Sequence, residues 1–401
     1  MANASGVFKQ VAYKKESTFG TLAGASGAQS LRRISCDLSL NKDTYGSNEV
    51  RGDLQKNDFR HGVKRGTGKL SSDLSPKTVA DFFGSFCKKP FAAGVSATAV
   101  SLTIAGSGPY TVTRAAGSYL TDGFKVGDVI RLSVGSLNVN NISKNLLITG
   151  LTGTVATVVT LNGSAMTAEG PVTGCTVAVA GKKTWIPTSG FVEESYTFEQ
   201  FYDTPASEAF TGVKINGFGV TLSATGIATV DFDLLAKDMT PGSTQYFTSP
   251  TAPTTTGSLA AVNGLMRAGG AAVAVLTGLT ITGAANYSGD PVVGSNTVPQ
   301  FYPGMVEVSG QATAYFDSTT LRDAFLNETE IDLMGVFTSD NTATADFMSF
   351  VMSRVKLLSH TKSDGAGAVT VTMQFQALLN SAGGTGLATE KTTLSIQDSA
   401  A

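Results

Sequence analysis

An internal duplication restricts the fold of this chain more than any other feature of its sequence. The stretch VKRGTGKLSSDLSPKTVADFF at 63–83 aligns with MVEVSGQATAYFDSTTLRDAF at 305–325, at a constant offset of 242 residues that places Gly68 on Gly310. Both copies run from a strand-like stretch into a short helical pattern. A repeated unit is expected to fold in the same way each time, so the fold must be built twice from one supersecondary pattern.

The helical part of each copy has a start signal and an apolar stripe. In the first copy we expect Ser75 to be the N-cap and Pro76 to take the first helical position, where its missing N–H costs nothing. In the second copy we expect Asp317 to be the cap. The stripes have helical spacing and consist of Val79, Phe82, Phe83 and Phe86 in the first copy, and of Leu321, Ala324 and Phe325 in the second.

The later parts of the two copies also match. TVDFDLLA at 229–236 aligns with TMQFQALL at 372–379 at an offset of 143 residues. Both stretches alternate polar and apolar residues, as half-buried strands do. This offset is 99 residues smaller than the first, so the first copy holds an insertion that the second lacks.

We assign the insertion to residues 90–185, where short alternating stretches are broken by glycine turns, a pattern typical of a small barrel or sandwich. A linker rich in Thr, Pro and Ser at 248–261 separates the copies. The sequence therefore predicts a mainly-β chain. It contains two sandwich or barrel units, each with one short flanking helix. The first unit is discontinuous and occupies 1–89 and 186–250, and the second occupies 251–401. A small inserted β-domain occupies 90–185.

Composition excludes several classes of protein. Charged residues make up only 15% of the chain and the formal net charge is −2, which disfavours duplex nucleic-acid binding driven by net positive charge. The three cysteines show neither metal-ligand nor disulfide spacing. No secretion signal and no apolar run long enough to span a membrane occurs, so we expect the protein to be made and kept in the cytosol of its producer.

Catalytic motifs are equally scarce. The sequence contains two histidines, His61 and His360, which leaves little material for a catalytic triad or a histidine metal site. Neither a nucleophile elbow nor a P-loop occurs. Asp231 and Asp233 lie two residues apart on one strand face, but the aligned positions in the second copy are Gln374 and Gln376. This exchange of Asp for Gln favours a solvent-exposed sheet face over a catalytic acid–base pair. We expect no enzymatic activity, no cofactor and no metal.

The most highly charged stretch is SNEVRGDLQKNDFRHGVKRGTGKL at 47–70, which includes an Arg-Gly-Asp tripeptide. A nucleic-acid arm would carry more aromatic residues and fewer acids, and a tripeptide of this kind occurs by chance in many proteins. The aligned segment of the second copy is almost neutral. We therefore interpret the stretch as a loop between copies of the protein, where charge gives orientation and specificity. Its contact residues would be Arg51, Lys56, Arg60, His61, Lys64 and Arg65.

Three stretches together resemble a known family. KKESTFGTLAG with LRRISCDLSLNKDTYGSNEVR, then GKLSSDLSPKTVADFFGSF, and finally RVKLLSHTKSDGAGAVTVTMQFQAL are similar to the major tail tube proteins of long, non-contractile-tailed bacteriophages. The resemblance covers the two copies without the insertion. It implies a β-sandwich flanked by a helix, whose inner sheets join between subunits into a closed ring. The rings stack into a tube through which the phage genome passes.

The resemblance also implies partners and a place for the insertion. Family rings are typically sixfold with one unit per chain, so a chain with two units implies a trimer with pseudo-sixfold symmetry, with a hexamer of whole chains as the alternative. The tape measure, the tail terminator and the tip would be further partners, double-stranded DNA would pass without specific binding, and no membrane is involved. The inserted domain would project outside the tube, and the protein would belong to the virion.

A conduit for DNA needs a polar, neutral-to-acidic wall. The polar residues of the two aligned strands suit such a lumen: Thr229, Asp231, Asp233, Thr372, Gln374 and Gln376. The alternative function is a surface-exposed carbohydrate-binding or adhesive β-protein that uses the inserted domain. That domain offers only Tyr110, Tyr119 and Phe124 as aromatic residues, which a small core would use.

Overall fold

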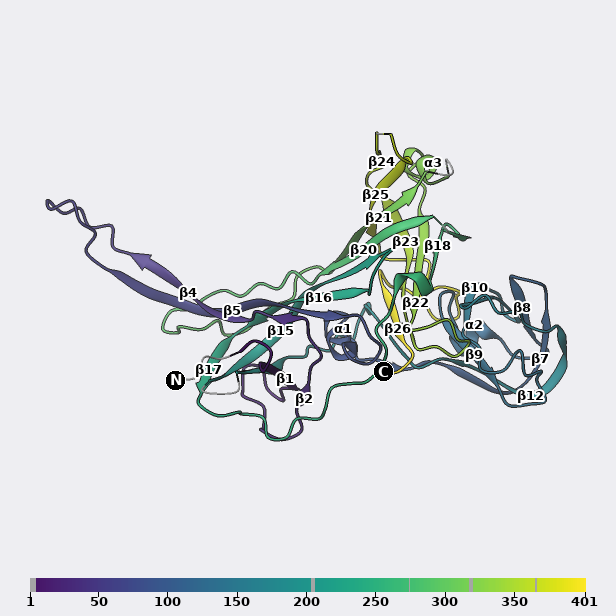
Figure 1. Cartoon of the computed structure of the whole chain (residues 1–401), viewed down its shortest axis with the longest axis horizontal. Coiled ribbons are helices and arrows are strands. Elements are labelled where there is room, and N and C mark those ends of the chain that lie inside the picture. Colours follow the sequence, from purple (N-terminus) through teal and green to yellow (C-terminus); the bar gives the residue numbers. More distant parts are fainter. Residues whose placement is uncertain (1–4, 203–205, 274, 317–319, 365) are drawn as a thin grey trace.

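A computed structural model describes residues 5–202, 206–273, 275–316, 320–364 and 366–401. Strands dominate the described part and its helices are short, which confirms the predicted mainly-β class. Figure 1 shows a long hairpin (β4–β5) that reaches away from the body on one side and a barrel (β7–β12) on the opposite side. The two copies of the repeat form the body between them.

The first copy is a set of antiparallel strands that neighbour one another in a sheet. The strands in spatial order are β3 (Ser35–Cys36) with β4 (Ser39–Gly46), β5 (Phe59–Asp73), β16 (Thr229–Ala236), β15 (Ser207–Ser223) and β14 (Tyr196–Phe201). The second copy has the same order. Its strands are β20 (Leu276–Ala284), β21 (Glu307–Tyr315), β25 (Thr370–Ala377), β23 (Phe347–Leu357) with β24 (Thr361–Lys362), and β22 (Ile331–Thr338).

The register of pairing corrects one of the two sequence offsets. Gly66 of β5 and Val308 of β21 correspond at the offset of 242 residues. Ala236 lies opposite Gly66, and Ala377 lies opposite Val308, so the neighbouring strands β16 and β25 correspond at an offset of 141 residues. The offset of 143 was wrong by two residues. A slip of two residues leaves every side chain on its own face of the sheet, so the polar–apolar pattern alone does not exclude it.

The inner strands of the two copies are joined by the pairing of β15 with β20. The end of β15 runs between β16 and β20, with Val220 opposite Ile281 and Thr221 opposite Thr280. The result is a continuous sheet in the order β3/β4–β5–β16–β15–β20–β21–β25–β23/β24.

Helix α1 (Ala80–Phe86) lies in the core, and burial of its stripe is confirmed: Val79, Phe82, Phe83 and Phe86 are all at most 1% exposed. The predicted start was wrong, because Val79 occupies the N-cap position without a side-chain cap. The Ser75 hydroxyl instead donates to Thr78 Oγ1 at 2.7 Å, next to a turn at 76–79. A serine stabilises such a turn as readily as a helix start.

Helix α3 (Thr320–Leu326) is the counterpart of α1, and its predicted cap, Asp317, lies outside the described residues. Figure 1 shows α3 at the end of the second copy's sheet, whereas α1 lies within the body. The predicted stripe is accordingly only half-buried at Leu321, Ala324 and Phe325. The two helices therefore contribute unequally to the core.

Shorter strands complete the body. They are β1 (Gln10–Lys15), β2 (Gln29–Ser30), β6 (Ala92–Ala93), β13 (Lys182–Trp185), β17 (Asp238–Gly242), β18 (Gly264–Ala268), β19 (Ala271–Ala272) and β26 (Ser395–Asp398), with a 3-10 turn at Ala261–Asn263. β1 pairs with β14 in the first copy, and β26 pairs with β23 in the second.

A closed six-stranded barrel lies between β6 and β13 in the chain. Its strands are β7 (Ser96–Ala105), β8 (Tyr110–Arg114), β9 (Val129–Ser133), β10 (Leu146–Leu151), β11 (Val155–Thr160) and β12 (Glu169–Val179), with helix α2 (Tyr119–Asp122) between β8 and β9. The barrel has its own apolar core. Tyr110, Tyr119 and Phe124 all belong to that core, as expected from the sequence, so they form no exposed aromatic platform.

The barrel packs against the second copy, although its sequence interrupts the first. Val129 and Leu147 of the barrel form a buried cluster with Val336 and Phe347 of β22 and β23. The amide of Gln397, in β26, donates to the carbonyl of Val129 at 2.8 Å and accepts from its N–H at 2.9 Å. These contacts fix the barrel to the body.

Candidate functional site

Strand β16 presents three of the predicted lumen residues on one face. Val230, Phe232 and Leu234 are buried in the core, at most 2% exposed. Thr229, Asp231 and Asp233 alternate with them and are half-buried on the opposite face. Strand β25 repeats this arrangement, with its buried Val371, Met373 and Phe375 and its polar Thr372, Gln374 and Gln376.

The continuous sheet brings all six residues onto the same face. In the register of the intervening strands, Asp231 lies opposite Gly219, Gly219 opposite Thr282, Thr282 opposite Ser309, and Ser309 opposite Gln376. Directly opposed residues point to the same side of a sheet. One cross-strand row therefore connects the first copy to the second.

Neighbouring strands contribute further polar residues that sequence reasoning did not single out. Together with the six predicted residues they form the polar face: Ser39, Thr67, Lys69, Ser71, Thr221, Ser223, Thr280, Thr282, Ser309, Gln311 and Thr313. The same period-two alternation in LTGLTITGA and EVSGQATAY was the signal that could have found the members in β20 and β21.

The polar face carries charge in both copies: Lys69 and Asp233 in the first, and Glu307 and Lys356, which lies opposite Gln376, in the second. Asp233 pairs with Lys69 across 3.5 Å, and both side chains are half or more exposed. The corresponding members in β25 carry hydroxyl and amide groups, and Thr372 shares a hydrogen bond with Thr313. The solvent therefore contacts mainly hydroxyl and amide groups on this face, and its charged residues are not arranged as a catalytic acid–base pair.

Two strand edges of this sheet are free of main-chain partners in the described part of the chain. β3 and β4 pair only with β5, and β24 pairs only with β25. They lie at opposite ends of the sheet. An unpaired edge is a template for another strand, so natural proteins either cover it or use it.

The charged stretch forms the outer part of the β4–β5 hairpin, which we call the arm: strands β4 and β5 up to Arg65, with the loop at 47–58 between them (Figure 1). Most arm residues are exposed. Arg51 pairs with Asp53 at 2.9 Å, so the charges of the Arg-Gly-Asp tripeptide neutralise each other, and this pairing lowers the pKa of Asp53.

The other predicted arm residues differ in whether an ion pair within the same chain already holds their side chains. Lys64 forms a half-buried ion pair with Asp238 at 2.7 Å, and Arg65 pairs with Asp43 at 3.0 Å. Arg60 pairs with Asp58 but its side chain remains 84% exposed, and Lys56 is exposed in the loop. His61 packs edge-on against the Phe59 ring.

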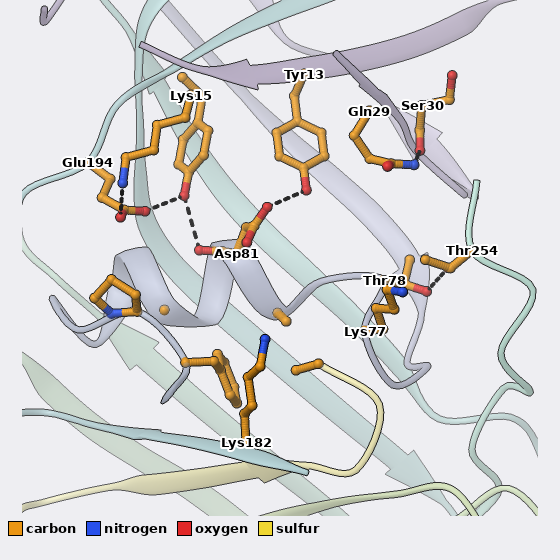
Figure 2. A pocket seen from close by; sticks show the side chains of 16 residues that line it. Tyr13, Lys15, Gln29, Ser30, Lys77, Thr78, Asp81, Lys182, Glu194 and Thr254 are labelled. Carbon is orange, nitrogen blue, oxygen red and sulfur yellow. Dashed lines mark hydrogen bonds and ion pairs between the residues drawn. The ribbon is translucent and has the colours of Figure 1, made fainter. Parts of the chain in front are cut away.

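A cleft of about 400 Å³ lies between α1, β1 and the segment before β14 (Figure 2). Tyr13 donates to Asp81 at 2.7 Å, Tyr196 donates to Glu194 at 2.8 Å, and Lys15 pairs with Glu194. Burial raises the pKa of both phenols, so they stay protonated. These bonds occupy both carboxylates and hold α1 against β1, which is a structural role.

Within the described ranges, no cluster of three or more His, Cys, Asp or Glu side chains is arranged to hold a metal ion. None of the helices in the same ranges has the length and apolar character needed to cross a membrane.

Comparison with known proteins identifies the family. A search of curated proteins found no match. A structure of the SPP1 tail tube, determined by solid-state NMR and cryo-EM, is 19% identical, covers 40% of this chain and 72% of its own, and superposes with a TM-score of 0.17, too low to support an argument. The family model for phage tail tube proteins matches residues 9–377. The chain therefore belongs to the phage tail tube proteins, structural components of the virion's tail.

Proposed function

We propose that this chain closes into rings that stack into the tail tube of a long, non-contractile-tailed phage, and that the genome passes through the tube during infection. The observation that carries the proposal is the continuous eight-position sheet with a polar face and, among the described residues, an edge without a strand partner at each end. Repeating such a sheet around an axis pairs every edge and leaves none to aggregate.

The proposed ring contains three chains. Each chain supplies two copies of one unit with the same strand order, so three chains give a pseudo-sixfold ring. A ring of six whole chains is the alternative, with twice the number of units. The two copies differ in charge and in their helices, so a threefold ring would alternate unlike units.

The polar face would line the lumen. Duplex DNA carries one negative charge per ~1.7 Å of its axis, so a cationic wall would hold it. On this face the carboxylates of Asp231, Asp233 and Glu307 outnumber the two lysines, Lys69 and Lys356, and the hydroxyl and amide groups of β25 add no positive charge. The lumen assignment of Thr229, Asp231, Asp233, Thr372, Gln374 and Gln376 is part of this proposal.

The arm would contact a neighbouring ring, and the barrel would form a projection outside the tube. The barrel has its own apolar core and meets β22 and β23 at a cluster that includes Phe347 and is separate from the core of the body. This supports the division into a first unit at 1–89 with 186–250, an inserted domain at 90–185 and a second unit at 251–401. Other tail proteins, namely the tape measure, terminator and tip, would bind the assembled tube.

Electron microscopy of the purified protein tests the ring proposal. We expect rings or tubes with a central channel in negative stain, and threefold symmetry with a pseudo-sixfold inner wall by cryo-EM. A strict sixfold ring of whole chains would replace the trimer with the alternative. Monomers that stay dispersed at high concentration would contradict the tube function itself.

A charge reversal tests the role of the arm. Arg60→Glu combined with Lys56→Glu changes two exposed side chains, whereas Lys64 is unsuitable because its pair with Asp238 supports the fold. We expect folded protein that forms rings but does not stack them. Lys391→Glu, at another exposed position, is the matched control. Normal tubes from the arm variant would remove the arm from the ring–ring contact.

A further inference from the structure

The junction between the two copies within one chain has a definite register. β15 and β20 run antiparallel, with Gly219 opposite Thr282 and Thr221 opposite Thr280. The side chains of Thr221, Thr280 and Thr282 lie on the polar face. The junction thus joins the last inner strand of the first copy to the first inner strand of the second.

The first copy contains a counterpart of β20. Cys36 lies opposite Leu70 as Leu279 lies opposite Ala312, and Leu40 lies opposite Gly66 as Gly283 lies opposite Val308. With β5 and β21 offset by 242 residues, β3 and β4 therefore match β20 at an offset of 243. In this register Ser39 corresponds to Thr282.

The second copy contains a counterpart of the junction part of β15. Thr361 lies opposite Thr372 as Gly219 lies opposite Asp231, and Lys362 lies opposite Val371 as Val220 lies opposite Val230. β24 therefore matches residues 219–220 of β15. In β15 the other side of this segment is covered by β20, whereas the same side of β24 has no strand partner in the described part of the chain.

We infer that the edge of β24 pairs with the edge of β4 in a second copy of this chain, in the register of the β15–β20 junction. This inference rests on the proposed function and specifies its chain-to-chain contact. Thr361 of one chain lies opposite Ser39 of the next, and Ser359 opposite Asn41. The register keeps Thr361 and Ser39 on the polar face, so the face continues from chain to chain.

Side chains limit this pairing at one end. The carbonyl of Leu38 already accepts from Gln200 Nε2 at 2.6 Å, and that of Cys36 accepts from Lys9 Nζ at 2.6 Å. The strand pairing therefore centres on Ser39–Asn41. Side-chain donors at the adjoining positions block slipped pairings, which is a common protection of exposed edges.

Cysteine cross-linking tests the register in assembled full-length protein. The chain carrying both Ser39→Cys and Thr361→Cys has two exposed thiols, while the native Cys36, Cys87 and Cys175 are buried. Directly opposed residues lie within disulfide reach, whereas positions displaced by two residues do not. Mild oxidation should link chains through these two positions and yield a covalent ladder that ends at the number of chains in one ring.

The controls shift the register or stay within one chain. Thr361→Cys combined with Asp37→Cys, or with Asn41→Cys, places the thiols two residues out of register, and we expect about tenfold less cross-linked product from either. Thr221→Cys with Thr280→Cys should form a bond inside one chain and no ladder. Each single-cysteine variant shows the background.

The outcomes separate this inference from the proposed function. Rings together with cross-linking of the Ser39 and Thr361 positions support both. Rings that cross-link only in a slipped pair, or in none, overturn the register and leave the tube function standing. Absence of both rings and cross-links overturns both.

Discussion

Replacing Phe83 by Ala should destabilise both copies of the unit at once. The ring is 0% exposed on α1 and makes edge-on contacts with Phe218 and Phe232 of the first copy, at 5.3 and 5.2 Å. It makes another with Phe350 of the second copy at 5.7 Å. Truncation of a buried Phe costs about 3–5 kcal/mol, including the cavity left behind. Each edge-to-face aromatic pair adds about 0.5–1.5 kcal/mol of stability. Because Phe83 makes three such pairs, we expect its truncation to cost an amount at the upper end of that range.

The assay is urea unfolding of the unassembled protein, followed by hydrogen exchange. We expect the free energy of unfolding to fall by about 4 kcal/mol, and amide exchange to rise in both β16 and β23. Phe191→Ala, at a side chain that is 58% exposed, should change stability by about 0.5 kcal/mol or less. A loss below about 1.5 kcal/mol, or faster exchange in the first copy alone, would refute α1 as the element that couples the copies.

Three further predictions concern the lumen, the barrel and pH. Gln374→Lys combined with Thr372→Lys should leave tubes intact but give them a salt-sensitive affinity for duplex DNA in a filter-binding assay. Thr152→Lys, on the barrel, should give no such affinity. Equal DNA binding by both variants would contradict the lumen assignment. Lys183→Met removes the ion-pair partner of the buried Asp128, which lies at 2.9 Å, so thermal unfolding should show a loss of about 3–5 kcal/mol. Arg51→Met, at an exposed ion pair, should leave thermal unfolding almost unchanged. Burial raises the pKa of Asp398 to about 6, so its protonated form favours the fold; that contribution is complete below pH 3.8 and is lost as pH rises through 6. Asp398→Asn should therefore gain about 2–3 kcal/mol relative to the parent between pH 4 and 7, and parallel stability curves would exclude this effect.

Much of the fold was predictable because its signals are local. Alternation in TVDFDLLA and TMQFQALL identified two strands and assigned their faces, since side chains alternate across a strand. The buried stripe of α1 followed from helical spacing. The polar residues of β16 and β25 were found in the same way, and the structure places all six on one sheet face.

Other features were beyond local signals. The start of α1 was misplaced because Ser75 stabilises a turn in the same manner as it would cap a helix. The arm's charges were read as free for a partner, yet Lys64 is held by Asp238, more than a hundred residues away in the chain. No spacing in the sequence reports such a contact.

The sequence by itself determined that one strand–helix unit occurs twice, that it is built of half-buried strands, and that one face of these strands is polar. These properties depend on side-chain period, which is written in consecutive residues. Only the tertiary structure decided the register between strands, the docking of the barrel on the second copy and the two edges that have no strand partner among the described residues. A strand slipped by two residues keeps the same face and the same pattern, so its position is set by the neighbours it packs against.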